Sequence, residues 1–232
     1  MKDIVRFVRI SLTEEYIFMR NQFTPKFEEL PSALPLFPIR DAVVLPNAQL
    51  PLNIFEPRYL EMVSDALSSN RLIGMIQPLD DERDELYQTG CLGRIVSFSE
   101  TRDNRILLLL SGISRFDILR EVDFGAGYRK AEISFDRFIL DLIDDKIEYD
   151  RQQLILLAKR YLNHKRLNVE WSTMDELSFI ELVDTLGSSL PFSSRDKQGI
   201  IETIRIQNRC EMIAALCEFT ADYAVDGEER TH

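Results

Sequence analysis

The strongest constraint on the fold is a change in hydrophobic pattern near residue 141. Before it, short apolar runs are bounded by Gly, Pro, Asp, Asn or Ser, as in strands joined by turns. After it, apolar residues recur at the three- and four-residue spacing of helices. The runs cover 71–77, 92–98, 105–110, 116–122 and 128–135. The pattern predicts an α+β chain with a mostly antiparallel β domain over 34–140 and a helical bundle over 141–224.

One helix is expected inside the β region. Pro57 suits the first helical position, and apolar residues then recur with helical spacing as far as Leu67, so the helix should end near Asn70. Residues 102–104 are polar and turn-forming, and they separate two β-prone runs. They therefore predict an antiparallel hairpin.

Capping residues place the later helices. The first is marked by apolar positions between Ile147 and Leu162. Thr173 with Glu176 resembles a capping box that opens a second helix through Leu186, ended by Gly187. Ser193 with Asp196 forms a similar cap at the start of a third helix. The apolar spacing of this helix is interrupted at 206–208, where Asn208 with Glu211 could cap a new start, so a break in the third helix is predicted.

The two ends of the chain are expected to lie outside the core. Residues 1–33 form a predicted N-terminal arm, of which the first 18 are either dispensable or the product of a wrongly assigned start, since Met19 follows them. They lack the continuous apolar region and cleavage site of a secretory signal. Residues 225–232 are predicted to be a disordered tail.

Charge and cysteine content restrict the partners and the compartment. The formal net charge of -11 opposes binding to a phosphate backbone, so no nucleic-acid partner is expected. No apolar run approaches the roughly 20 residues that cross a bilayer, so no membrane partner is expected either. The cysteines Cys91, Cys210 and Cys217 are odd in number and lack C-x-x-C spacing, which favours buried thiols in a cytoplasmic protein.

Motifs for catalysis or cofactors are not found in the sequence. It contains no phosphate-binding G-x-x-x-x-G-K-[ST] loop, no G-x-S-x-G turn and no H-E-x-x-H helix. His164 is expected at a polar helix end rather than as a general base. The acidic stretch 80–85 is interpreted as a solvated loop, with weak Ca²⁺ binding as the alternative. We therefore expect no enzyme activity, no cofactor and no metal site.

A family resemblance is carried by the stretch LPLFPIRDAVVLPNAQLPLNIFEPRYLEMV, residues 34–63, and by 71–78, 90–121 and 190–202. These segments resemble, in the same order, the N-terminal domain of Lon proteases. The resemblance implies a PUA-like β-barrel with one inserted helix, followed by a helical bundle. It also implies substrate recognition without the ATPase and Ser-Lys peptidase, which this chain stops short of.

The family signature includes Phe55, Glu56, Arg58, Tyr59, Arg115 and Phe116. We expect the three aromatic rings in the core, since aromatic side chains in strands and amphipathic helices usually pack inward. The charged members are interpreted as buried, paired residues that fix the helix against the barrel. A direct role in partner binding is the alternative, because Arg is enriched in interface hot spots.

The resulting hypothesis is a non-catalytic module that binds unfolded or extended protein segments. Such a module could serve as an adaptor for a protease or chaperone supplied in trans, and a sheet edge or groove could hold the segment by strand addition. The alternative is an RNA-binding PUA-like protein, which the acidic charge disfavours. A cryptic hydrolase is the third hypothesis.

Overall fold

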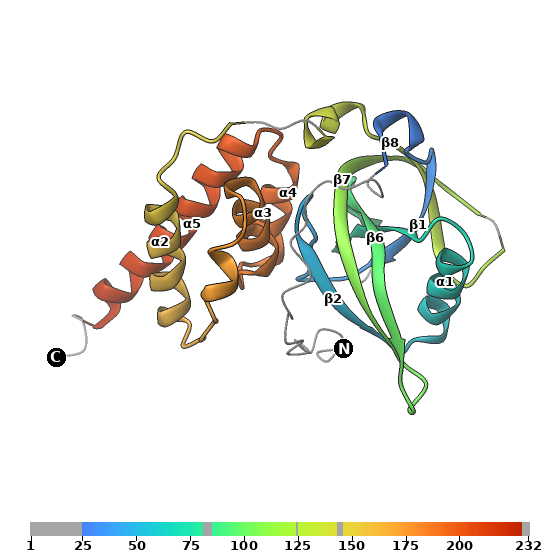
Figure 1. Cartoon of the computed structure of the whole chain (residues 1–232), viewed down its shortest axis with the longest axis horizontal. Helices are drawn as coiled ribbons and strands as arrows, with labels where there is room; N and C mark the ends of the chain where they lie inside the picture. Colours follow the sequence, from blue (N-terminus) through green and yellow to red (C-terminus); the bar gives the residue numbers. More distant parts are fainter. Residues whose placement is uncertain (1–24, 81–84, 124, 143–145, 229–232) are drawn as a thin grey trace.

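The structure is a computed structural model that describes residues 25–80, 85–123, 125–142 and 146–228. A strongly bent sheet forms one half of the molecule, and helices α2 to α5 form the other (Figure 1). Helix α1 lies on the side of the sheet that faces away from the other helices (Figure 1). The predicted order, strands first and helices afterwards, is confirmed.

The sheet has the strand order β2-β7-β6-β3-β1-β8, with an additional pairing between β7 and β8. Only the β1–β3 pair is parallel within it, so the predicted antiparallel character is confirmed. The strands are β1 (Ala33–Pro38), β2 (Gln49–Ile54), β3 (Leu72–Ile76), β6 (Thr89–Glu100), β7 (Ile106–Val122) and β8 (Arg129–Ser134). A separate small pair consists of β4 (Pro78–Asp80) and β5 (Glu85–Leu86). These strands include both ends of the predicted acidic loop, whose residues 81–84 lie outside the described residues.

The runs predicted at 105–110 and 116–122 are one continuous strand, β7. The prediction of two strands was wrong because Ser111 and Gly112 resemble a turn. Gly112 does not form a turn but allows a close approach of backbone. A Cβ atom there would lie 2.0 Å from the carbonyl oxygen of Leu45, so glycine lets the β1–β2 segment cross the strand closely.

Two local predictions in the sheet region are confirmed. Helix α1 (Pro57–Leu67) begins with Pro57 and buries Tyr59, Met62, Val63 and Ala66. The hairpin between β6 and β7 closes with the Thr101 N–H donating to the Arg105 carbonyl at 2.9 Å. Asn104 has φ of 60°, a backbone conformation that asparagine tolerates better than most residues.

The helical half consists of η2 (Asp136–Leu142), α2 (Arg151–His164), η3 (Ser172–Met174), α3 (Phe179–Ser189), α4 (Ser194–Glu202) and α5 (Ile206–Glu228). The cap at Ser193 is confirmed, since its hydroxyl accepts the Asp196 N–H. His164 is exposed at the end of α2, as predicted.

Two predicted helix boundaries were wrong. The capping box that opens α3 is Ser178 with Glu181, not Thr173 with Glu176. Gly187 lies inside α3 instead of ending it, because the helix packs tightly there: a Cβ atom would lie 2.7 Å from Leu45 Cδ1.

The ends of α5 also differ from the prediction. The break before α5 lies at 203–205 rather than at 206–208, and α5 continues to Glu228, into the predicted tail. The proposed start at Met19 and the dispensable first 18 residues lie outside the described residues, as do 229–232. None of the helices in the part of the chain that the structure describes has the length and apolar character needed to cross a membrane.

A hydrophobic core joins the sheet to the helices. The segment between β1 and β2 runs through it, with Val44 and Leu45 fully buried between β7 and α3. All three cysteines are free and buried, as predicted. A second apolar cluster, which includes Leu36 and Phe116 of the sheet, packs against Leu142 of η2. The sheet and the helices therefore share one interior.

Gly112→Ala tests the close crossing of β7 and the β1–β2 segment. We expect a loss of about 1–3 kcal/mol of unfolding free energy, since the clash is with backbone that cannot rotate away. Gly127→Ala is the matched control, because its nearest neighbour at 3.2 Å is the flexible carboxylate of Glu61. Urea denaturation of both variants is the measurement, and equal midpoints would contradict the packing described.

Candidate functional site

A groove of about 1090 Å³ opens between the sheet and the helices. Its walls come from the end of β1 and the segment after it, strand β2, the start of α1, the β7–β8 connection and the α3–α4 junction. Lining residues include Phe37, Arg40, Asp41, Gln49, Pro51, Asn53, Phe55, Glu56, Arg58, Tyr59, Arg129, Phe192 and Lys197. Because these elements are distant in the sequence, the groove depends on how the two halves are held together.

Strand β2 presents an unpaired edge to this groove. Among the described strands it pairs with β7 alone, at the end of the strand order. The Gly112 N–H donates to the Ala48 carbonyl at 2.9 Å. In an antiparallel ladder, successive residues direct their backbone N–H and C=O groups to opposite sides of the strand. Those of Leu50 and Leu52 therefore point toward β7, and those of the residues that alternate with them point toward the free edge.

The alternate residues are Gln49, Pro51 and Asn53. Proline has no N–H, so its position on the unpaired side costs no ladder hydrogen bond. The side-chain Oδ1 of Asn53 is buried and accepts no hydrogen bond from the described residues. The edge therefore offers free backbone groups and an unused acceptor to a bound molecule.

Aromatic residues form part of the groove lining, and Phe55 is the most exposed of them. The rings of Phe37 and Tyr59 pack with centroids 4.5 Å apart, and Phe192 packs on Tyr161 at 5.1 Å. Phe55 is 39% exposed, with the Arg105 guanidinium 5.5 Å from its ring centre. Such a wall favours apolar side chains beside the polar strand edge.

The cation Lys197 connects two walls of the groove. Its Nζ donates to the carbonyl oxygens of Asp41 at 3.0 Å and Ser188 at 3.1 Å. Burial lowers the pKa of Lys197 to about 8, and Asp41 opposes this shift. A further link is made by the Leu45 N–H, which donates to the Ser188 hydroxyl at 3.0 Å. These bonds fix the β1–β2 segment against the end of α3.

A buried ionic network holds the two halves in place. Arg115 of β7 is fully buried and donates from Nε and Nη2 to the Asp141 carboxylate, with a shortest distance of 2.6 Å. Its remaining donors bind the carbonyl oxygens of Ile201, Thr203 and Ile204, so that every N–H of the guanidinium is used. These carbonyls end α4, and the arginine therefore caps that helix.

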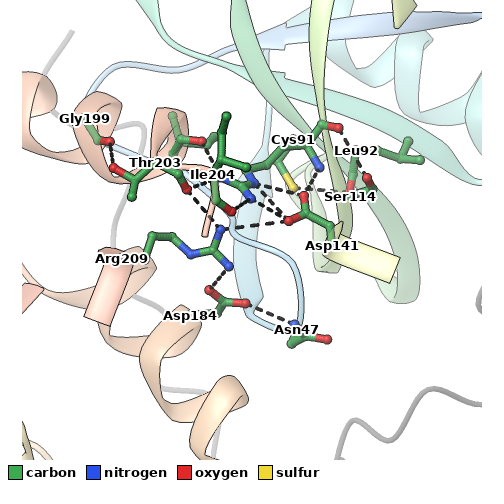
Figure 2. Close-up of polar contacts among 12 residues, drawn as sticks. Asn47, Cys91, Leu92, Ser114, Asp141, Asp184, Gly199, Thr203, Ile204 and Arg209 are labelled. Carbon is green, nitrogen blue, oxygen red and sulfur yellow. Dashed lines mark hydrogen bonds and ion pairs between the residues drawn. The ribbon is translucent and has the colours of Figure 1, made fainter. Parts of the chain in front are cut away.

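The network continues into the helices, as Figure 2 shows. Arg209 of α5 lies 3.9 Å from Asp141 and 3.0 Å from Asp184 of α3. Asp184 in turn accepts a hydrogen bond from the Asn47 side chain at 3.0 Å. The chain of contacts thus joins β7, η2, α5, α3 and the segment that precedes β2.

The charge of Asp184 is costly in this position. Burial raises its pKa to about 6, although Arg209 and Asn47 favour the charged form. Burial also lowers the pKa of Arg209, whose Nε donates no hydrogen bond to the described residues. The network therefore contributes to fixed geometry more than to net stability.

Glutamine side chains make a second polar bridge between the halves. Gln77, just after β3, donates to the Gln198 side chain at 3.1 Å and to the Ser194 carbonyl at 3.0 Å. Gln198 of α4 donates to the carbonyl oxygen of Thr89 at 3.2 Å. The N-terminal half of α4 is therefore fixed to the sheet independently of Arg115.

The residues predicted from the sequence separate into two groups. Phe55, Glu56, Arg58 and Tyr59 line the groove, whereas Arg115 and Phe116 lie in the interior. Burial was predicted correctly for Tyr59, Phe116 and Arg115.

For the other three signature residues the expected burial was wrong. The Arg58 side chain is 55% exposed and pairs with Glu56, which is 31% exposed. Phe55 is also partly exposed. The reason is the proline that follows Glu56: it starts α1 at the molecular surface, so the residues beside it face the groove.

Sequence reasoning missed Asp141, Asp184, Lys197, Arg209 and Asn53. Asp141 and Asp184 stand within the apolar stretches FILDLI and ELVDTL, where a carboxylate needs a buried partner. The position of each aspartate in an apolar stretch was therefore visible in the sequence. The identity of its cationic partner was not, because that partner comes from a distant element.

Comparison with known proteins identifies the class of this fold. Residues 33–217 match the substrate-binding domain of the ATP-dependent protease La (LON), and the chain belongs to this family. It is 26% identical over 199 residues to Lon protease of Dictyoglomus thermophilum and 27% identical over 200 residues to that of Desulfosudis oleivorans. Each match covers 80% of this chain and 24% of the relative, so the chain spans about a quarter of their length.

Solved structures agree with this assignment. A Lon N-terminal domain protein from Xanthomonas campestris is similar with a TM-score of 0.57 and 25% identity, covering 80% of this chain and 98% of that one. The N-terminal domain of Lon protease from Mycobacterium avium complex has the same fold, with a TM-score of 0.56, 16% identity and the same coverage.

Arg115→Met tests the network. We expect a loss of about 3–5 kcal/mol of unfolding free energy, because the buried Asp141 loses its closest cation and keeps Arg209 at 3.9 Å, and three carbonyl oxygens lose their donor. The control is Arg120→Met, since Arg120 is 68% exposed and pairs with Glu132 at the surface. It should cost under about 1 kcal/mol. Similar urea midpoints for the two variants would show that the network has no such role.

The titration of Asp184 tests its environment directly. Its pKa is raised from 3.8 to about 6, so its protonation favours the folded state. The stabilisation of the folded state by protonated Asp184 is complete at pH values below 3.8 and is lost as the pH rises through about 6. Carboxyl ¹³C NMR should show one aspartate with a midpoint near 6 that disappears in Asp184→Asn. Titration of that signal near 4 would refute the prediction.

Proposed function

We propose that this chain is a non-catalytic module that binds extended protein segments in the groove beside β2. The observation that carries the proposal is the edge of β2, which pairs with no second strand among the described residues and lies beside a groove lined partly by aromatic side chains. An extended segment pairs its backbone with such an edge and places alternate side chains against the neighbouring walls. The family assignment, a substrate-binding domain, supports the same interpretation.

The finer features of this proposal follow from the family and the fold. The additional pairing of β8 with β7 links the end of the strand order back to an earlier strand, which is compatible with a PUA-like barrel, and the proposal includes that architecture. The bound segments are unfolded or extended regions of other proteins. A protease or chaperone in trans would receive them, which makes the module an adaptor in the cytoplasm.

Binding of a synthetic peptide tests the proposal. The probe is a fluorescein-labelled peptide of about ten residues, long enough to pair with an ordinary strand, with alternating leucine and serine around a central glutamate. We expect saturable binding by fluorescence anisotropy. Phe55→Ser should weaken it about tenfold, because the exposed ring gives up apolar contact with the peptide. Leu156→Ser is the control, since Leu156 is 58% exposed on α2 and lies outside the groove.

Peptide methylation distinguishes strand pairing from loose apolar contact. N-methylation of alternate residues removes the N–H groups on one edge of an extended peptide. One alternate set should abolish binding and the other should leave it nearly unchanged. Equal effects of the two sets, or equal loss in Phe55→Ser and Leu156→Ser, would reject the groove as the binding site.

A further inference from the structure

Lys197 differs from the other buried cations of this protein. Arg115 and Arg209 are each within 3.0 Å of an aspartate oxygen. Lys197 is only 6% exposed, yet it makes no ion pair with any carboxylate of the described residues. The Asp41 carboxylate accepts a hydrogen bond from the Ser194 hydroxyl, and it raises the pKa of Lys197 from beyond ion-pair distance.

Within the part of the chain that the structure describes, the hydrogen bonds of Lys197 use two of its three donors. An ammonium group has a third N–H beyond the two that bind the carbonyl oxygens of Asp41 and Ser188. A buried charge whose opposite charge lies beyond ion-pair distance is only partly compensated by that charge and by carbonyl dipoles. A purely structural clamp explains the two bonds but gives no reason for a charge at the wall of a groove.

The groove lining includes the cations Arg40, Arg58, Arg129 and Lys197 and the carboxylates Asp41 and Glu56. Arg58 pairs with Glu56, and Arg129 pairs with Glu121, so these two cations already have carboxylate partners. Lys197 lies within ion-pair distance of no carboxylate of the described residues, so a carboxylate of a ligand would complement its charge.

We propose that Lys197 binds a side-chain carboxylate of the segment held in the groove, so that the module selects segments with an Asp or Glu among apolar residues. This inference rests on the proposed function. A side chain rather than a chain terminus is proposed, because a segment paired along β2 would extend across the groove past the elements that line it, namely the β1–β2 segment, α1, β8 and α4.

Replacement of the central glutamate of the peptide by glutamine tests this inference. Two versions of the peptide described above, both acetylated and amidated, carry either glutamate or glutamine at the centre. The glutamate peptide should bind wild-type protein about tenfold more tightly, as expected for one charge-assisted hydrogen bond. Lys197→Gln should remove this preference, since its amide can still donate to the carbonyl oxygens but carries no charge. Lys197→Arg should retain part of it.

The control variant is Lys159→Met, because Lys159 is an exposed residue of α2 outside the groove. It should leave the preference unchanged. If circular dichroism shows that Lys197→Gln does not fold, the Glu-to-Gln affinity ratio in Lys197→Met, which is also neutral, decides the question. A ratio identical to that of wild type in folded Lys197→Met would then overturn the inference.

The possible failures are distinguishable. Equal binding of the two peptides to wild-type protein overturns the role of Lys197 and leaves the proposed function intact. Binding of neither peptide contradicts the proposed function itself. A preference that persists in folded Lys197→Gln assigns the carboxylate to another cation. A glutamine peptide that gains affinity only when its terminal carboxylate is free would show a terminus-binding site instead, and this also overturns the inference.

Discussion

The ion pair between Arg115 and Asp141 is the interaction on which the rest of the structure depends. The Arg115 guanidinium donates to the Asp141 carboxylate of η2 and to three carbonyl oxygens at and just after the end of α4. The bonds to Asp141 and Ile201 are buried, so their loss would leave buried polar groups without partners, and this favours one relative arrangement of the strand, η2 and the α4–α5 break. Arg209 and Asp184 extend the same constraint to α3 and to the segment before β2.

This constraint determines the groove. One wall of the groove is the sheet and another is the end of α3. The chain that connects these two walls runs through the whole of η2 and α2, so the connection itself does not fix their positions. Asn47, held by Asp184, lies two residues before Gln49, where β2 begins. Lys197 and Ser188 fix the same segment from the other side. The unpaired strand edge is thus held rigidly, which reduces the entropy that an extended ligand must lose on binding.

Much of this fold was predictable from local signals. Pro57 began a helix, residues 102–104 closed a hairpin and Ser193 capped α4, because each depends on a few neighbouring residues. The errors arose where a distant contact decides the structure. Gly112 and Gly187 resemble a turn and a helix end, but both are glycine because Leu45 packs against them. Phe55, Glu56 and Arg58 were recognised as important and placed in the interior, whereas they border the groove.

The most direct measurement of the central claim is amide hydrogen exchange of β2 by NMR, with and without saturating peptide. Gln49 and Asn53 direct their N–H groups to the free edge, whereas those of Leu50 and Leu52 face β7. Strand pairing predicts that peptide slows exchange of the Gln49 and Asn53 amides and changes Leu50 and Leu52 little. Unchanged exchange at Gln49 and Asn53 with peptide bound would contradict the account.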